Sequence, residues 1–258
     1  ADFGTGITTV TLAAGAHSGN AGDISFNAGT SVLNIKDVND GDLTLTVAGT
    51  ATTDSLTINL TDSTNVDVFS NEAITTTEIE NITLNTTHAG STATAQDITT
   101  LSMTANTGGV TKLTIIGSNA LALDAVTANT IDASGATGAI TQSTNMVGTA
   151  SGTNVLKGGS GADTLVGDTD DTTNIDGNGG NDNLTGGSDA ETINGGAGND
   201  TINTSTGADT LNGGDGNDSI TMGAATQTVD GGAGNDTVYA LNFLAYGYSV
   251  AGGAGTDI

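Results

Sequence analysis

A nine-residue repeat between residues 158 and 239 is the feature that most restricts how this chain can fold. The segments that begin at residues 158, 195, 213 and 231 read G-G-x-G-x-D-x-U-x, where U is a large aliphatic residue, and the segment at residue 177 differs only by Asn178 at the second glycine. Three residues around each U position are too few for a helix. They suit a short strand with its middle side chain inward, and the glycines suit tight turns. The repeat predicts an all-β parallel roll with two units per turn.

Alternate units of the repeat fall on the same edge of such a roll, and the two edges differ. Units beginning at 158, 177, 195, 213 and 231 form what we call the first edge, whereas those at 167, 186, 204 and 222, on the second edge, have lost most of the pattern. The first edge therefore carries a column of carboxylates, which are Asp163, Asp182, Asp200, Asp218 and Asp236.

This column needs a counter-charge that the chain does not supply. Two carboxylates on neighbouring turns, about 4.8 Å apart, repel by roughly 3–4 kcal/mol at an effective dielectric near 20. No Lys or Arg follows Lys157 to relieve that repulsion. A divalent cation in each of the four gaps between the five loops would relieve it. Carboxylate and carbonyl oxygens are the ligands that Ca²⁺ prefers and Zn²⁺ does not, and Mg²⁺ demands a tighter geometry.

The repeat resembles the calcium-binding nonapeptide of RTX proteins, for which this pattern is the known signature. The resemblance implies that Ca²⁺ is held by the five column aspartates and by loop backbone at Gly159, Gly161, Gly179, Gly180, Gly196, Gly198, Gly214, Gly216, Gly232 and Gly234. On the second edge it extends to Asp209, and more weakly to Glu191, Asp170 and Asp171, while Gln227 departs from the pattern. Asp257 would add a site if loop 252–257 stacks on loop 231–236. Without calcium, residues 158–258 are expected to be largely disordered, because metal binding and folding are then one event.

The rest of the chain reads as strand as well. Residues 1–112 are rich in Thr and Ala and contain alternating stretches such as 43–47, 56–60 and 66–69, which predict strands of a β-solenoid. Residues 113–157 are expected to form a transition between this solenoid and the calcium roll, because Asn154 occupies the position of the Asp of the repeat. Residues 158–239 are the calcium roll, and residues 240–258 are an aromatic strand and a partial loop that either caps the roll or docks a partner. The fold class is thus an all-β parallel β-solenoid passing into a calcium-bound RTX β-roll.

Charge and motif content exclude several functions. The formal net charge of −26 argues against binding to nucleic acid or to an anionic membrane. No run of 18 apolar residues is present, so no transmembrane segment is predicted. His17 and His88 lack the H-E-x-x-H spacing of zinc proteases, and neither a nucleophile elbow nor a P-loop occurs. We therefore predict that the chain is not an enzyme.

The Thr-rich strands also resemble, less specifically, the β-solenoid regions of bacterial S-layer proteins that carry RTX repeats. The two resemblances together imply a secreted protein of the bacterial cell surface, exported by a type I machine. The predicted function is a calcium-dependent structural subunit of an extracellular array, an S-layer or filament, that self-associates and is anchored by another region or chain. Two alternatives remain open: a secreted adhesin module, and the RTX tail of a larger secreted enzyme or toxin.

Overall fold

The computed structural model of the chain is built from parallel strands. It describes residues 9–12, 24–27, 30–36, 43–48, 54–61, 72–77, 79–87, 96–104, 111–143, 152–223, 225–240 and 247–258. These residues form strands, turns and bends, with no helix among them and hence no helix able to span a membrane. The predicted all-β parallel class is therefore confirmed. The chain groups into two compact units, residues 1–150 and 151–258, whereas the division into four segments stays a prediction.

In the first unit, odd-numbered and even-numbered strands form two parallel sheets. The odd strands are β1 (Thr9–Leu12), β3 (Thr30–Lys36), β5 (Ser55–Thr61), β7 (Asn81–Asn85), β9 (Lys112–Gly117) and β11 (Thr130–Ala136). The even strands are β2 (Ile24–Asn27), β4 (Leu43–Ala48), β6 (Glu72–Thr77), β8 (Gln96–Thr104), β10 (Leu121–Thr127) and β12 (Ile140–Gln142). The stretches 43–47 and 56–60 are thus strands as predicted, whereas 66–69 lies outside the described residues.

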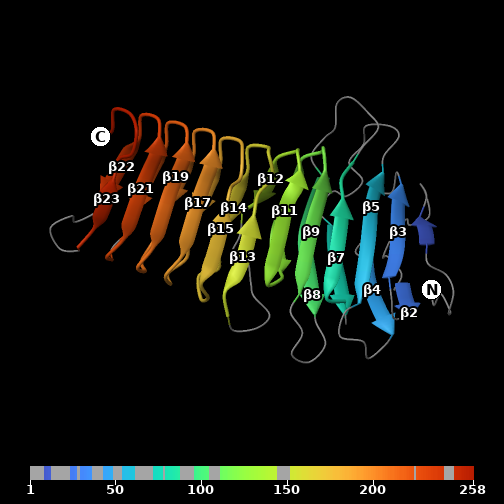
Figure 1. Cartoon of the computed structure of the whole chain (residues 1–258). Helices are drawn as coiled ribbons and strands as arrows, with labels where there is room; N and C mark the ends of the chain where they lie inside the picture. Colours follow the sequence, from blue (N-terminus) through green and yellow to red (C-terminus); the bar gives the residue numbers. More distant parts are fainter. Residues whose placement is uncertain are drawn as a thin grey trace. The chain divides into compact units, whose positions relative to one another are not determined.

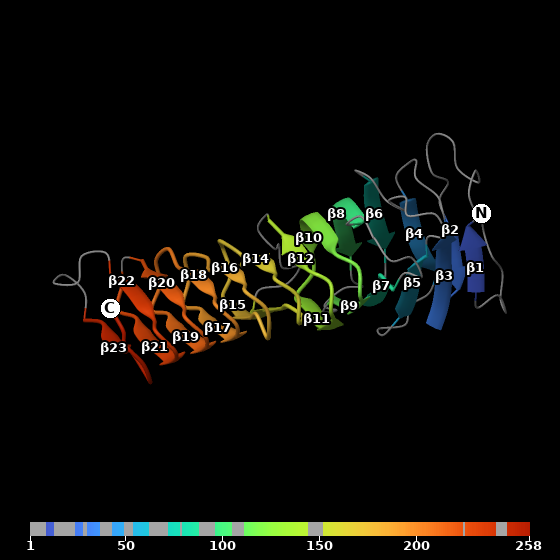
Figure 2. The ribbon, with the colours of Figure 1, turned by 90° about the horizontal axis from the view of Figure 1, so that it is seen from above.

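The second unit repeats this arrangement with shorter strands. Its odd strands are β13 (Asn154–Lys157), β15 (Thr173–Asp176), β17 (Thr192–Ala197), β19 (Thr210–Asp215), β21 (Thr228–Ala233) and β23 (Ser249–Ala251). Its even strands are β14 (Thr164–Val166), β16 (Asn183–Thr185), β18 (Thr201–Asn203), β20 (Ser219–Met222) and β22 (Thr237–Ala240). The odd strands β15, β17, β19, β21 and β23 lie side by side in this order (Figure 1), and the view from above separates the even layer from the odd layer (Figure 2).

Stacked aliphatic side chains form the core between the two layers of the second unit. Leu184 pairs in register with Ile202, and Ile202 with Ile220, in the even sheet. All three are fully buried. Ile193 and Leu211 do the same in the odd sheet. Burial of one such side chain contributes about 1.5–3 kcal/mol, so each turn helps to fix the register of the next. This register places the loops of one edge above one another.

Candidate metal centre

The loops of the first edge bring the predicted aspartates into one column. Each aspartate directly precedes an even strand, and its backbone N–H donates a hydrogen bond to Oδ1 of the aspartate one turn further on. The distance is 2.8 Å from Asp163 to Asp182, 2.8 Å from Asp182 to Asp200, 2.7 Å from Asp200 to Asp218, and 2.8 Å from Asp218 to Asp236. All five side chains are at most 2 % exposed. The predicted column of carboxylates is therefore present, one per turn.

Only one oxygen of most of these carboxylates is satisfied by the protein. The Oδ2 atoms of Asp182, Asp200, Asp218 and Asp236 are buried and have no hydrogen-bond partner. Buried polar groups nearly always have a partner, because an unsatisfied one costs about 1–3 kcal/mol and more when it is charged. From Asp182 to Asp236 the column thus presents one unsatisfied carboxylate oxygen per turn, whereas Oδ2 of Asp163 accepts a hydrogen bond from the N–H of Gly159 at 2.7 Å.

The first glycine of each loop leaves room for these oxygens. A Cβ on Gly177 would collide both with Oδ2 of Asp182 and with the carbonyl oxygen of Gly195 on the next turn. The same collision would occur at Gly195 and at Gly213, with the corresponding aspartate and carbonyl. Our sequence analysis did not select these first glycines, although they recur in every first-edge unit. They open a space where a carboxylate oxygen and a carbonyl oxygen of successive turns approach each other.

The glycines that were predicted mostly shape the turns. Seven of them have φ between +100° and +141°, a region that favours glycine. These are Gly180, Gly196, Gly198, Gly214, Gly216, Gly232 and Gly234. In the loop at 177 the second position is Asn178, with φ of 67°. Stacking is tight, because a Cβ on Gly216 would collide with the carbonyl oxygen of Gly198 on the preceding turn. The role of these residues as metal ligands stays a prediction.

Burial without a basic partner raises the pKa values of three aspartates in the middle of the column. Burial, followed by the charges of Asp163 and Asp200, raises the pKa of Asp182 from 3.8 to about 7. Burial and the charges of Asp200 and Asp236 raise the pKa of Asp218 to about 6. Burial also raises the pKa of Asp200. A cation supplies the missing counter-charge and reverses these shifts, since an adjacent positive charge favours the ionised carboxylate.

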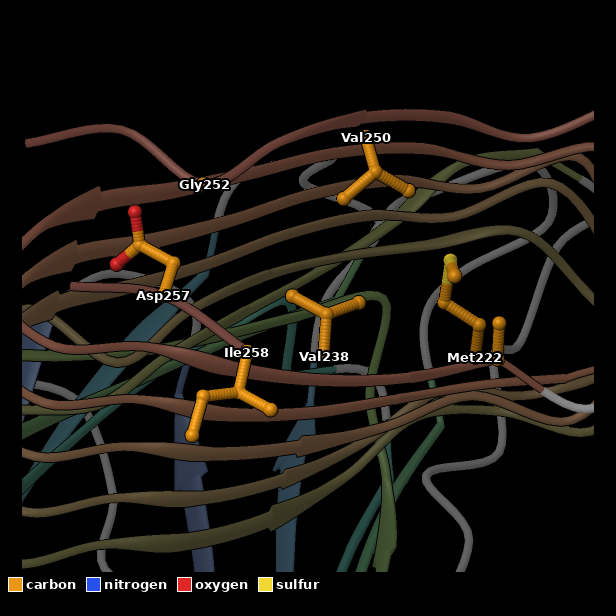
Figure 3. Close-up of a pocket in the computed structure, with 7 residues that line it drawn as sticks. Met222, Val238, Val250, Gly252, Asp257 and Ile258 are labelled. Carbon is orange, nitrogen blue, oxygen red and sulfur yellow. The ribbon is translucent and has the colours of Figure 1, made fainter.

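The column continues by one more turn at the C-terminal side. The backbone N–H of Asp236 donates to Oδ1 of Asp257 at 3.1 Å, and Ala233 and Ala254 form a parallel β-bridge. Loop 252–257 therefore stacks on loop 231–236, as the sequence suggested. Figure 3 shows Asp257 beside Gly252 and Ile258, and these residues line a cavity of about 260 Å³ together with Val238 and Val250 at this end of the roll. A fifth gap thus lies between Asp236 and Asp257, and its occupancy by metal stays a prediction.

The second edge contains only part of what the sequence suggested. Asp209 and Glu191 occupy equivalent positions on adjacent turns and are buried. Asp170 is exposed and Asp171 half-buried, and neither lies in that column. In this turn the column position, two residues before the inward Ile175, is occupied by the buried Thr173. The reason is that the ten-residue unit has one extra residue, which lengthens its loop. One turn beyond Asp209, the same position of the second edge is occupied by the fully buried Gln227.

The aromatic segment that was expected to cap the roll or dock a partner is only partly described. Residues 241–246 lie outside the described residues. Tyr248, directly before β23, donates a hydrogen bond from its hydroxyl group to the carbonyl oxygen of Gly223 at 3.0 Å, whereas Tyr239 is 57 % exposed. One tyrosine thus contributes to the packing of the last turn.

The donor set of the first edge fits calcium. Within the described ranges no three His, Cys, Asp or Glu side chains converge on one point, so each gap offers two carboxylates and backbone carbonyls. Such all-oxygen sets with few side chains suit Ca²⁺ and lack the nitrogen and sulfur ligands of zinc sites. The residues therefore fit the ion that the pattern predicts.

The fold and this column define a calcium-binding parallel β-roll. Its repeats are RTX calcium-binding nonapeptide repeats: the model of that family matches four times, at residues 149–172, 169–202, 195–226 and 223–242. These repeats bind Ca²⁺, and four copies fit about four or more sites. A search of curated proteins and a search of solved structures gave no significant match.

Proposed function

We propose that this chain is a calcium-dependent structural subunit of an extracellular bacterial surface array, an S-layer or filament. RTX repeat proteins are typically secreted by a type I machine and are extracellular, which fits folding after export. The observation that carries the proposal is the burial of the unsatisfied column carboxylates inside stacked loops. An ion at this place holds turns together, whereas a catalytic or ligand-binding ion needs an open coordination position.

Repetition of the outer sheet surface supports assembly. Thr192, Thr210 and Thr228 follow one another in register on the odd sheet of the roll. Beside them, the Nδ2 atom of Asn212 donates to Oδ1 of Asn194 at 2.9 Å. A surface with the same side chains at each turn can meet a copy of itself in several equivalent registers, which suits a lattice or filament. We also propose that the chain has no catalytic activity, because the sequence has no zinc-protease motif, nucleophile elbow or P-loop.

Light scattering combined with negative-stain imaging tests the proposal. The protein is titrated from chelator to about 10 mM calcium, a range that covers extracellular calcium sites. We expect ordered sheets or filaments to form with calcium and to dissolve in chelator. The double variant Asp200→Asn/Asp218→Asn should need more calcium. The control Asp189→Asn/Asp215→Asn loses two exposed acids outside the Thr and Asn rows of the odd sheet and should assemble like the wild type. A calcium-loaded protein that folds but stays monomeric would refute the array and favour an adhesin module or an enzyme tail.

A further inference from the structure

The outer surface of the even sheet of the roll carries no charged side chain. Residues 158–258 contain 15 Asp and Glu residues and no Lys or Arg. All of these acids lie in the loops or on the odd sheet, and none lies on β14, β16, β18, β20 or β22. We call the outward side of these five strands the even face. It is an uncharged surface on a strongly acidic domain.

Strand register arranges the side chains of the even face in two straight rows, with one residue of each row per turn. None of these side chains is buried. Figure 2 shows the five strands side by side. The row that directly follows the aspartate column is Thr164, Asn183, Thr201, Ser219 and Thr237. The second row, two residues further along each strand, is Val166, Thr185, Asn203, Thr221 and Tyr239.

The other surfaces of the roll are less suited to contact with a second copy of the chain. The odd sheet presents Lys157, Asp176 and Asp230 on its outer side, and the loops of both edges carry the remaining acids. Two copies of an acidic chain repel each other. A charge that is buried in a contact without a partner also costs far more than a hydroxyl or an amide group that finds one. Two copies therefore approach each other at the lowest electrostatic cost through the even face.

The order of residues in the second row is complementary to itself. A two-fold axis parallel to the central strand β18 places β14 opposite β22, and β16 opposite β20, of the second copy. Val166 then meets Tyr239 of the second copy, whose side chain is 57 % exposed, and Thr185 meets Thr221. Asn203 meets its own counterpart on the axis. Apolar groups thus face each other, and so do hydroxyl groups and amides, which both donate and accept hydrogen bonds.

The first row matches in the same way. Thr164 meets Thr237 of the second copy, Asn183 meets Ser219, and Thr201 meets its own counterpart. All of these side chains are small or of medium size and carry hydrogen-bonding groups. Two such faces can therefore pack like the sheets of a β-sandwich, about 10 Å apart and with nearly aligned strands.

We propose that the even face binds the even face of a second copy of this chain, in a two-fold contact centred on β18. Five strands at about 4.8 Å, with about three residues each, cover only about 20 Å by 10 Å, so the contact belongs to the weak, transient class. It needs the folded roll and therefore calcium. A two-fold contact closes with two copies, so it does not depend on an array, and an array needs a further contact such as the odd sheet.

Cysteine cross-linking tests this contact, because the chain contains no cysteine of its own. The reagent is a bis-maleimide that reaches about 10 Å, the spacing of two packed sheets. In calcium, Asn203→Cys should give a linked dimer by itself. Thr164→Cys and Thr237→Cys should each stay monomeric alone, because equivalent residues of the two copies then lie four strand spacings, or about 19 Å, apart. An equal mixture of these two variants should link.

The single variants are the matched controls for random collision. Chelator should abolish all linking, and far-UV circular dichroism in calcium confirms that each variant is folded. Linking of Thr164→Cys alone to the same extent as the mixture would overturn the two-fold register, and a lack of linked dimer in every case would overturn the contact. Ordered sheets or filaments without these links would leave the array and remove this contact, whereas links without ordered assembly would do the reverse.

Discussion

Acid should replace calcium in stabilising the roll. In the metal-free protein, burial raises the pKa of Asp182 from 3.8 to about 7 and that of Asp218 from 3.8 to about 6. Both groups bind a proton more tightly in the folded roll than in the unfolded chain. The stability of the folded state is then greatest below the unfolded pKa, and it is lost as the pH rises through the folded pKa values. The metal-free roll should therefore be more stable at about pH 5 than at about pH 8.

The magnitude follows from the two pKa values. One pKa unit corresponds to about 1.4 kcal/mol, and only the part of each shift between the two pH values counts. Asp182 then contributes a loss of about 3 kcal/mol from about pH 5 to about pH 8, and Asp218 about 1 kcal/mol. The raised pKa values of Asp200 and Glu191 add to the loss in the same direction. A loss of about 4 kcal/mol is a large part of the 5–15 kcal/mol that stabilises a typical domain.

Because the metal-free roll is expected to be largely disordered near neutral pH, this loss is measured from the amount of stabilising osmolyte that folds the metal-stripped protein at each pH, followed by far-UV circular dichroism. Asp182→Asn/Asp218→Asn should show about 4 kcal/mol less pH dependence, because its two amides do not titrate. Asp215→Asn/Asp230→Asn removes two exposed acids and should keep the wild-type pH dependence, which separates the buried column from the effect of net charge. A free energy of unfolding that is constant or rises between about pH 5 and about pH 8 would refute the reasoning.

Three further predictions concern packing and surface charge. Gly216→Ala should lower the free energy of unfolding of the calcium-loaded protein by at least about 2 kcal/mol in urea titrations. The reason is that the new Cβ collides with the carbonyl oxygen of Gly198 and that φ of +141° is unfavourable for alanine. Gly247→Ala is the control, because a Cβ there meets no atom within 4 Å. Ile202→Ala should cost about 2–5 kcal/mol in the same assay, as expected for a buried aliphatic side chain, and a cost below about 1 kcal/mol would contradict its place in the core. Lys112→Met should change the melting temperature little, since the 3.0 Å pair of Lys112 with Asp132 is partly exposed and such pairs contribute about 0–1 kcal/mol.

Sequence periodicity was sufficient to predict the column because strand register and loop length are coupled. With a nine-residue unit, a residue and its equivalent two units later lie on the same edge, so Asp200 had to stack on Asp218. Stacking of the loops also located Asp257, although the twelve residues 240–251 separate its loop from the preceding unit. The repeat therefore specified both the parallel class of fold and the order of the loops.

The second edge was harder to predict because residue type and position had separated there. Asp170 and Asp171 were predicted as ligands because they are acidic residues near the expected position. Their loop has one extra residue, however, so Thr173 lies at the column position. Position is fixed by the strand that follows, whose inward aliphatic residue is Ile175. Counting backwards from that residue would have identified Thr173. The contact of Gln227 could not be derived in this way, because it is a side-chain hydrogen bond from its Nε2 atom to Oδ2 of Asp209 on the neighbouring turn.

The two units differ in the source of the positive charge that compensates their acidic side chains. In the first unit Nζ of Lys112 lies 3.0 Å from Oδ2 of Asp132 on the neighbouring strand. Burial alone would raise the pKa of Asp132, but hydrogen bonds from Ser134 and Lys112 lower it. The roll contains no Lys or Arg after Lys157, so its buried acids remain uncompensated until an ion or a proton binds. Because the counter-charge comes from the solvent, its concentration controls whether the roll folds, and this makes the roll, unlike the pair in the first unit, responsive to calcium.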